Sequence, residues 1–195
     1  MLKPQKGVTL IELMIGLVVS AILLGIAVPN FSVFIQNTRI RNAAESIQDG
    51  LMLARSEAAR RNTHVQFVLG SGSSWTIGCE TVTDDCPASI QSRSAAEGSA
   101  DSTVTISEIE ADGTTNTSPA FDDTLGFDGL GRLAAGTLPA GSNAVFDVMN
   151  PSGESSCAVS GGELRCLRVI VSSGGQVRMC DPKLSETKPT DPQAC

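Results

Sequence analysis

Several residue types and motifs on which catalysis and metal binding depend are scarce or missing in this sequence of 195 residues. There is no tyrosine, one tryptophan and a single histidine, His64, and no two cysteines are spaced as Cys-x-x-Cys, which argues against a zinc site. The Gly-x-Ser-x-Gly, His-Glu-x-x-His and phosphate-loop motifs are also missing. We therefore predict a protein that is not an enzyme and that needs neither a metal nor a cofactor.

Positive charge is scarce in the larger part of the chain. Residues 63–195 contain seven Lys and Arg residues against seventeen Asp and Glu, whereas residues 8–62 contain five Arg against four acids. Binding to nucleic acid of any sequence depends on neutralising phosphates with basic side chains. The acidic part therefore argues against nonspecific nucleic-acid binding, although it leaves room for a local basic patch.

The cysteines are confined to the same acidic part of the chain. There are six, at positions Cys79, Cys86, Cys157, Cys166, Cys180 and Cys195. An even number in one region is typical of disulfides made in an oxidising compartment. Six cysteines allow fifteen pairings, and the sequence does not decide among them. The simplest choice joins neighbours in sequence, as Cys79–Cys86, Cys157–Cys166 and Cys180–Cys195.

One long apolar run dominates the N-terminal part. It extends from Val8 to Val28 and contains one charged residue, Glu12. A helix of this length, at about 1.5 Å per residue, crosses the hydrocarbon core of a bilayer, which is about 30 Å thick. Lys3 and Lys6 precede the run without any acid, so the positive-inside rule places residues 1–7 in the cytoplasm. The predicted precursor is a single-pass inner-membrane protein whose C-terminal domain is periplasmic.

Two simpler interpretations of this run are a cleaved secretory signal peptide and a plain membrane anchor. A signal peptide has a shorter apolar core that ends in a small-x-small cleavage site, whereas this run leads directly into a further helical pattern. Neither interpretation explains Glu12, because a carboxylate inside an apolar stretch is costly and usually functional.

The residues around Glu12 resemble a known processing signal. The sequence Lys6-Gly7-Val8-Thr9-Leu10-Ile11-Glu12-Leu13 is similar to the signal of type IV prepilins and type II secretion pseudopilins. In that family a prepilin peptidase cuts after the glycine and methylates the new N-terminal amine. The resemblance implies cleavage between Gly7 and Val8, with Val8 as the methylated residue in place of the phenylalanine that most members have.

The same resemblance implies roles in assembly for Glu12 and Pro29. In the family the glutamate at the fifth position of the processed chain pairs with the N-terminal amine of a neighbouring subunit. A subunit that enters the filament at the wrong axial position leaves this carboxylate unpaired in a low-dielectric interior, where an unpaired charge is strongly destabilising. Pro29 lies where family members have a kink or a melted segment in the filament core. A helix end at the membrane boundary, followed by a new helix, is an alternative.

Beyond Phe31 the sequence predicts a continued helix and then short strands. The helix extends to about Arg61 and carries one apolar stripe, suited to packing on a sheet, made of Ile40, Ala44, Ile47, Leu51, Ala54 and Ala58. Apolar stretches between Gly, Ser and Asp turns predict strands at 64–69, 74–79, 103–109, 144–149, 164–172 and 175–180. The segment 80–102 is polar and is predicted to be a long loop.

Three stretches of the sequence resemble the GspH/FimT group of minor pilins and pseudopilins. They are Leu53–Asn62 with the strand after it, Gly126–Arg132 (GFDGLGR) and Leu167–Arg178. The resemblance implies an α+β pilin fold, in which a long N-terminal helix with a transmembrane first half packs on an antiparallel β-sheet domain. The implied parts are a leader at 1–7, the helix at 8–62 with its membrane span at 8–28, and the domain at 63–195 with a disulfide-bounded loop at 180–195.

DNA is a less favoured partner. Members of the group that take up DNA carry a basic Gly-Arg-x-Arg element near the C-terminus, and the matching place here, Gly175–Arg178, has glutamine instead of the first arginine. Arg165, Arg168 and Arg178 could form a small positive strip on adjoining strands. Because the domain as a whole is strongly acidic, this strip gives little support for phosphate binding.

We therefore predict a structural protein, a FimU-like minor pilin that is processed, enters the pilus and helps to prime assembly at or near its tip. Its expected partners are other major and minor pilins, the prepilin peptidase and the inner-membrane assembly platform. Its expected location changes from the inner membrane to the extracellular pilus. Two alternatives stay open: a FimT-like DNA-binding pilin for natural transformation, and a GspH-like minor pseudopilin of type II secretion.

Overall fold

The structure of the chain, a computed structural model, describes residues 7–195 except 111, 118–121, 140 and 154–155, and for residues 26–30 it describes the backbone alone. The chain divides into two compact units, residues 1–35 and residues 36–195. Helix α1, Leu10–Arg61, contributes to both units, and every described strand lies in the second.

Local chemistry explains where α1 begins and ends. Thr9 precedes the first helical residue, and its Oγ1 accepts a hydrogen bond of 3.3 Å from the main-chain N–H of Glu12, as an N-cap threonine does. At the other end Asn62 has a φ of 49°, and the N–H of Thr63 donates to the carbonyl oxygen of Ala58. This is a Schellman C-cap with asparagine in the left-handed position.

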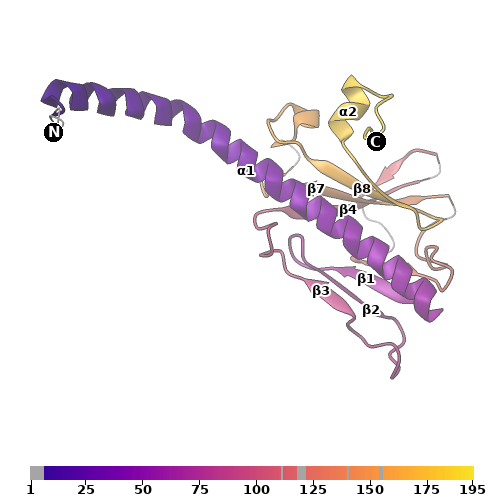
Figure 1. Cartoon of the computed structure of the whole chain (residues 1–195). Helices are drawn as coiled ribbons and strands as arrows, with labels where there is room; N and C mark the ends of the chain where they lie inside the picture. Colours follow the sequence, from indigo (N-terminus) through magenta and orange to yellow (C-terminus); the bar gives the residue numbers. More distant parts are fainter. Residues whose placement is uncertain (1–6, 111, 118–121, 140, 154–155) are drawn as a thin grey trace. The chain divides into compact units, whose positions relative to one another are not determined.

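The second unit contains two antiparallel sheets (Figure 1). The first has the order β3-β2-β1-β6 and consists of β1 Val65–Leu69, β2 Trp75–Cys79, β3 Gln91–Arg93 and β6 Thr124–Phe127. The second has the order β5-β4-β7-β8-β9 and consists of β4 Thr103–Ile109, β5 Thr115–Asn116, β7 Asn143–Met149, β8 Leu167–Ser172 and β9 Val177–Cys180. The predicted α+β pilin fold is confirmed, with two sheets where one sheet domain was expected.

The domain part of α1 lies across both sheets and buries one apolar face (Figure 1). All six residues of the predicted stripe are fully buried, and so is Ala43. Phe67 of β1 and Phe146 of β7 meet edge to face with their ring centroids 5.9 Å apart, so the two sheets share one core. A fully buried Leu, Ile or Phe side chain stabilises a fold by about 1.5–3 kcal/mol, so this face is the main attachment of the helix.

A glycine allows the helix to approach the first sheet closely. A Cβ atom at Gly50 would lie 2.8 Å from a ring carbon of Phe67 and 3.0 Å from one of Trp75. The indole Nε1 of Trp75 donates a 2.8 Å hydrogen bond to Oγ of Ser46 one turn earlier on the helix. Gly50 is unfavourable in a helix by about 1 kcal/mol relative to alanine, and this contact explains why it is there.

Most of the predicted strands are found, with shifts of a few residues at their ends. The prediction 164–172 was too long, because Leu164 pairs with Cys157 in an isolated bridge and β8 starts at Leu167. Strands β3, β5 and β6 were not predicted. The first two are short and polar, and carry no apolar alternation that sequence analysis could detect. The predicted loop at 80–102 is therefore interrupted by β3.

The C-terminal region folds over the outer face of the second sheet. It contains η2, Ala158–Ser160, and the short helix α2, Pro182–Thr187, which lies in the region predicted as a disulfide-bounded loop at 180–195. The side chain of Asp181 accepts a 2.9 Å bond from the N–H of Lys183 and caps α2. Residues of both elements line a cavity of about 430 Å³ above β4, β7 and β8.

Candidate assembly site

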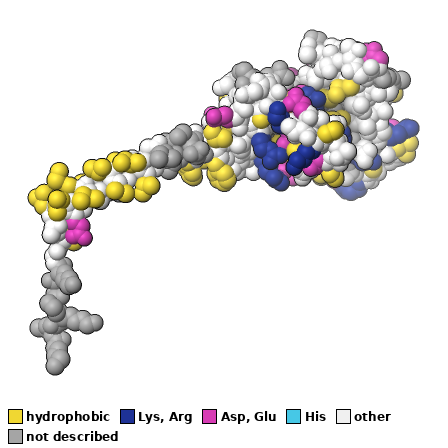
Figure 2. All heavy atoms as spheres, turned by 90° about the horizontal axis from the view of Figure 1, so that it is seen from above, with side chains coloured by type: hydrophobic (Ala, Val, Ile, Leu, Met, Phe, Trp, Pro, Cys, Tyr) yellow, Lys and Arg dark blue, Asp and Glu magenta, His cyan; other side chains and the backbone are white. Residues whose placement is uncertain are grey.

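The first half of α1 exposes a large apolar surface. Its described large apolar side chains up to Leu24 are between 50% and 78% exposed, and they are Leu10, Ile11, Leu13, Met14, Ile15, Leu17, Val18, Val19, Ile22, Leu23 and Leu24. Figure 2 shows apolar side chains gathered along this part of the helix. A helix that is apolar on all sides has to be covered by lipid or by other protein. The N-terminal unit is therefore built to be buried against something outside this chain.

Glu12 is placed by the cap of the helix. It is the third helical residue after Thr9, and the pattern Thr-x-x-Glu is that of a capping box, in which the threonine accepts from the N–H of the glutamate. A carboxylate in the first turn also interacts favourably with the positive end of the helix dipole. Thr9 was not predicted as a functional residue, although this spacing could have identified it.

The predicted cleavage position lies just before this cap. Gly7 and Val8 have no regular secondary structure, and Val8 is 70% exposed. A Cβ atom at Gly7 would meet nothing within 4 Å, so local packing does not require a glycine there. Lys3 and Lys6 of the predicted leader lie outside the described residues. Cleavage between Gly7 and Val8 stays a prediction.

Two predictions fall on residues whose side chains are not described. Across the part of the chain that the structure describes, no helix combines the length and the apolar character needed to cross a membrane. The membrane span predicted at 8–28 includes residues 26–28, whose side chains are not described, and it stays a prediction. Pro29 lies within α1, which is continuous from Leu10 to Arg61, and the predicted kink at this residue stays a prediction.

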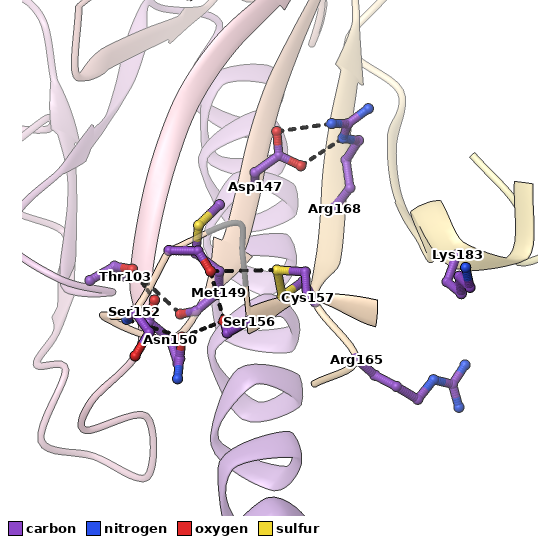
Figure 3. The surroundings of a disulfide bond; sticks show 12 residues. Thr103, Asp147, Met149, Asn150, Ser152, Ser156, Cys157, Arg165, Arg168 and Lys183 are labelled. Atoms are coloured by element: carbon purple, nitrogen blue, oxygen red, sulfur yellow. Dashed lines mark hydrogen bonds and ion pairs between the residues drawn. A yellow bond between two sulfur atoms is a disulfide. The ribbon is translucent and has the colours of Figure 1, made fainter. Parts of the chain in front are cut away.

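The three arginines considered for DNA binding each have a partner within the chain. Arg168 forms a bidentate pair with Asp147, at 2.7 and 3.0 Å (Figure 3). Arg165 contacts the nearly buried carboxylate of Asp181. The guanidinium of Arg178 donates to the carbonyl oxygen of Cys195. The structure brings these arginines to neighbouring strands and loops, but pairs two of them with acids.

Three disulfides brace this region and the loop after β2. They join Cys79 to Cys86, Cys157 to Cys166, and Cys180 to Cys195, with Cα–Cα distances of 5.7, 5.4 and 5.1 Å. All three are pairs of neighbours in sequence. Within the described residues no group of three or more His, Cys, Asp or Glu side chains could hold a metal ion. His64 lies 3.0 Å from a carboxylate oxygen of Glu80.

The Gly126–Arg132 motif forms a turn that joins the end of α1 to the second sheet. The carboxylate of Asp128 accepts bonds from the main-chain N–H groups of Leu130 and Arg132 and from the Arg132 guanidinium. Nε of Arg55 on α1 donates a 2.9 Å bond to the carbonyl oxygen of Gly131. The motif is thus structural, a role that the sequence resemblance did not reveal.

The turn at Asp128 predicts a pH-dependent stability. Although burial raises the pKa of Asp128, the N–H groups of Arg132 and Leu130 and the Arg132 guanidinium lower it below its ordinary value. The carboxylate therefore stabilises the fold above the unfolded-state pKa of about 3.9, and this stability is lost as the pH falls through the lower folded-state pKa. Asp128→Asn should reduce the free energy of unfolding by about 1–2 kcal/mol at neutral pH.

Urea unfolding of the wild type and of Asp128→Asn at several pH values measures this difference. We expect the two unfolding free energies to converge as the solution becomes acidic, because both side chains are then uncharged. A difference that does not change with pH would show that the charge of Asp128 is not what stabilises the turn.

The family models agree with this architecture. The model of the prokaryotic N-terminal methylation motif matches residues 2–28, and the model described as type II transport protein GspH matches residues 43–175. The fold and the N-terminal segment define a type IV pilin-like subunit. The match to the GspH model covers more than half of this chain, so the chain belongs to the GspH family.

Solved structures of minor pilins and pseudopilins are similar to this chain. The type IV minor pilin FimU of Pseudomonas aeruginosa strain PAO1 is 16% identical, with a TM-score of 0.50, over 75% of this chain and 91% of FimU. The minor pseudopilin EpsH from the type 2 secretion system of Vibrio cholerae is 13% identical, with a TM-score of 0.47, over 74% of this chain and 98% of EpsH. No curated protein matches the chain.

The family defines the general role of the chain. Its members are minor pilins and pseudopilins. The methylation motif and the family together imply a membrane-anchored precursor that assembles with other pilins into a pilus or a pseudopilus. The uncovered apolar half of α1 is the part of this chain that such an assembly would bury.

Proposed function

We propose that this protein is a minor type IV pilin with a FimU-like role, which a prepilin peptidase processes and which helps to prime pilus assembly at or near the tip. The observation that carries the proposal is the exposed apolar first part of α1, in which the single carboxylate of the run 8–28, Glu12, lies in the first turn. A chain that served only as an anchored periplasmic domain would have no need of this carboxylate.

The chemistry of assembly follows from this geometry. Cleavage after Gly7 would leave the amine of Val8 close in sequence to the capped first turn. Once apolar helices surround this segment, the Glu12 carboxylate needs a cationic partner, and the methylated amine of a neighbouring subunit supplies one. The cap bond from the main-chain N–H of Glu12 to Thr9 does not involve the carboxylate oxygens, which can accept from the neighbour.

A type II secretion pseudopilin is the second candidate, and the name of the matching family model favours it. The two machines share the helix and the processing signal, so the N-terminal segment does not separate them. DNA uptake receives little support, since Arg165 and Arg168 are neutralised by Asp181 and Asp147.

The test is a deletion of the gene in cells that build both a type IV pilus and a type II secretion system. We expect surface pili to be lost or greatly reduced while secretion of enzymes continues. In the complemented strain, mass spectrometry of sheared pili should find this protein with methylated Val8 as its first residue. Normal piliation with failed secretion would instead identify a pseudopilin.

A further inference from the structure

Hydrogen bonds hold α1 at the first residues of the globular unit. Oε1 of Gln36 accepts a 3.0 Å bond from Nδ2 of Asn150, and Oδ1 of Asn37 accepts a 2.8 Å bond from the main-chain N–H of Arg165. Asn150 directly follows β7 and Arg165 precedes β8, so both partners belong to the connection between these two strands of the second sheet. Gln36 is the first residue of the globular unit.

Asn150 is buried and all parts of its side chain are used. It is 9% exposed, and its Oδ1 accepts bonds from the N–H of Ser152 at 3.1 Å and from the hydroxyl of Ser156 at 2.6 Å (Figure 3). Its carbonyl oxygen accepts a bond from Oγ1 of Thr103 on β4. This leaves Nδ2 directed to Gln36, and losing that acceptor would leave a buried donor unpaired, which is costly.

A disulfide closes the single connection between β7 and β8 that contacts the helix. Cys157 is adjacent to Ser156, which bonds to Asn150 near the start of this connection, and Cys166 is adjacent to Arg165 at its end. The end that contacts Gln36 and the end that contacts Asn37 are therefore cross-linked. Movement of one end away from the helix would pull on the other.

These contacts differ in kind from the apolar face of the helix. Burial of an apolar stripe is not directional, so by itself it specifies the rotation of the helix less sharply than hydrogen bonds do. Hydrogen bonds have preferred distances and angles, so they are satisfied at one rotation only. Buried polar pairs that select one register are known from other helical assemblies.

We propose that Gln36, Asn37, Asn150 and the N–H of Arg165 form a polar clamp that sets the rotation of α1 against the second sheet. These are positioning residues, and the clamp acts as one unit through the Cys157–Cys166 disulfide. The rotation decides which face of the globular unit a neighbouring subunit meets in a filament. This consequence rests on the proposed function, whereas the clamp itself does not.

A double-mutant cycle on the full chain in detergent micelles tests the clamp. In Gln36→Glu the carboxylate still accepts from Asn150, and in Asn150→Asp the Gln36 amide can turn and donate to the carboxylate. The double variant places two carboxylates together without a donor. We expect each single variant to unfold like the wild type, and the double variant to show a coupling of about three- to hundredfold in the unfolding equilibrium constant.

The exchange rate of the Arg165 amide hydrogen shows whether the clamp is one unit, since neither substitution touches that residue. We expect it to rise about tenfold or more in the double variant, while the core amides of β8 keep their protection. An unchanged Arg165 amide would overturn the clamp. Equal acceleration in the core of β8 would also overturn it, because the contact would then serve overall stability.

Entry into pili tests the functional consequence separately. We expect the single variants to enter pili like the wild type and the double variant to be depleted, although all are cleaved after Gly7. Normal entry of a double variant that has lost Arg165 protection would overturn the link between helix rotation and assembly. If the wild type does not enter pili, the proposed function fails and the exchange result stands alone.

Discussion

A chain with the Glu12→Ala substitution is expected to be cleaved, methylated and folded like the wild type, and to be missing from pili. The side chain is on the exposed first half of α1, far in sequence from the globular core, so its loss should not affect folding. In an assembled filament the amine of the neighbouring subunit would lose its partner. Breaking a buried charge pair by removing one member costs about 3–5 kcal/mol, which corresponds to a loss of incorporation of more than a hundredfold.

Two further variants separate charge from size and from the helix cap. Glu12→Gln keeps the shape and removes the charge, and we expect it to fail almost as badly as Glu12→Ala. Thr9→Ala keeps the carboxylate but removes the N-cap, at a cost of about 1 kcal/mol to the first turn, so incorporation should fall only moderately. Immunoblots of membranes measure how much of each variant the cell contains, and immunoblots of sheared pili measure how much is incorporated. Normal incorporation of Glu12→Ala would remove the assembly role of this carboxylate.

The parts of the fold that depend on periodicity could be predicted from the sequence. The buried stripe from Ile40 to Ala58 follows helical spacing, and strands such as Val65–Leu69 alternate between buried and more exposed residues. Strands β3 and β5 and helix α2 could not be predicted. They are short and polar, and they are held by neighbouring strands or by a disulfide instead of by their own apolar pattern.

Sequence analysis predicted which residue carries the chemistry of the candidate site, but it did not predict which residues pair with one another in the fold. Glu12 is recognisable because a lone carboxylate in an apolar run is rare. The pairing of Arg168 with Asp147 depends on strand register, since the two residues lie opposite each other on β8 and β7. The bond from Asn150 to Gln36 joins residues more than a hundred positions apart. No local pattern contains this information, and so sequence analysis missed it.

The substitution Gly175→Ala is expected to cause a large loss of stability in the globular unit. Gly175 has a φ of 78°, a conformation that costs an alanine about 1–2 kcal/mol. A Cβ atom there would also lie only 2.1 Å from the carbonyl oxygen of Gly131, which accepts the bond from Arg55. Adding the cost of forcing two main-chain segments apart, we expect a loss of about 3 kcal/mol or more in the free energy of unfolding.

The neighbouring Gly174 is a matched control in the same hairpin. Its added Cβ would meet only Oγ of Ser172, at 3.8 Å, and its φ is not in the left-handed range, so Gly174→Ala should change stability by less than about 1 kcal/mol. Urea unfolding of both variants measures the difference. Similar stability of the two would mean that the hairpin and the Gly126–Arg132 turn separate easily. A large difference would instead show that these two family motifs, which are far apart in the sequence, form one junction against the end of α1.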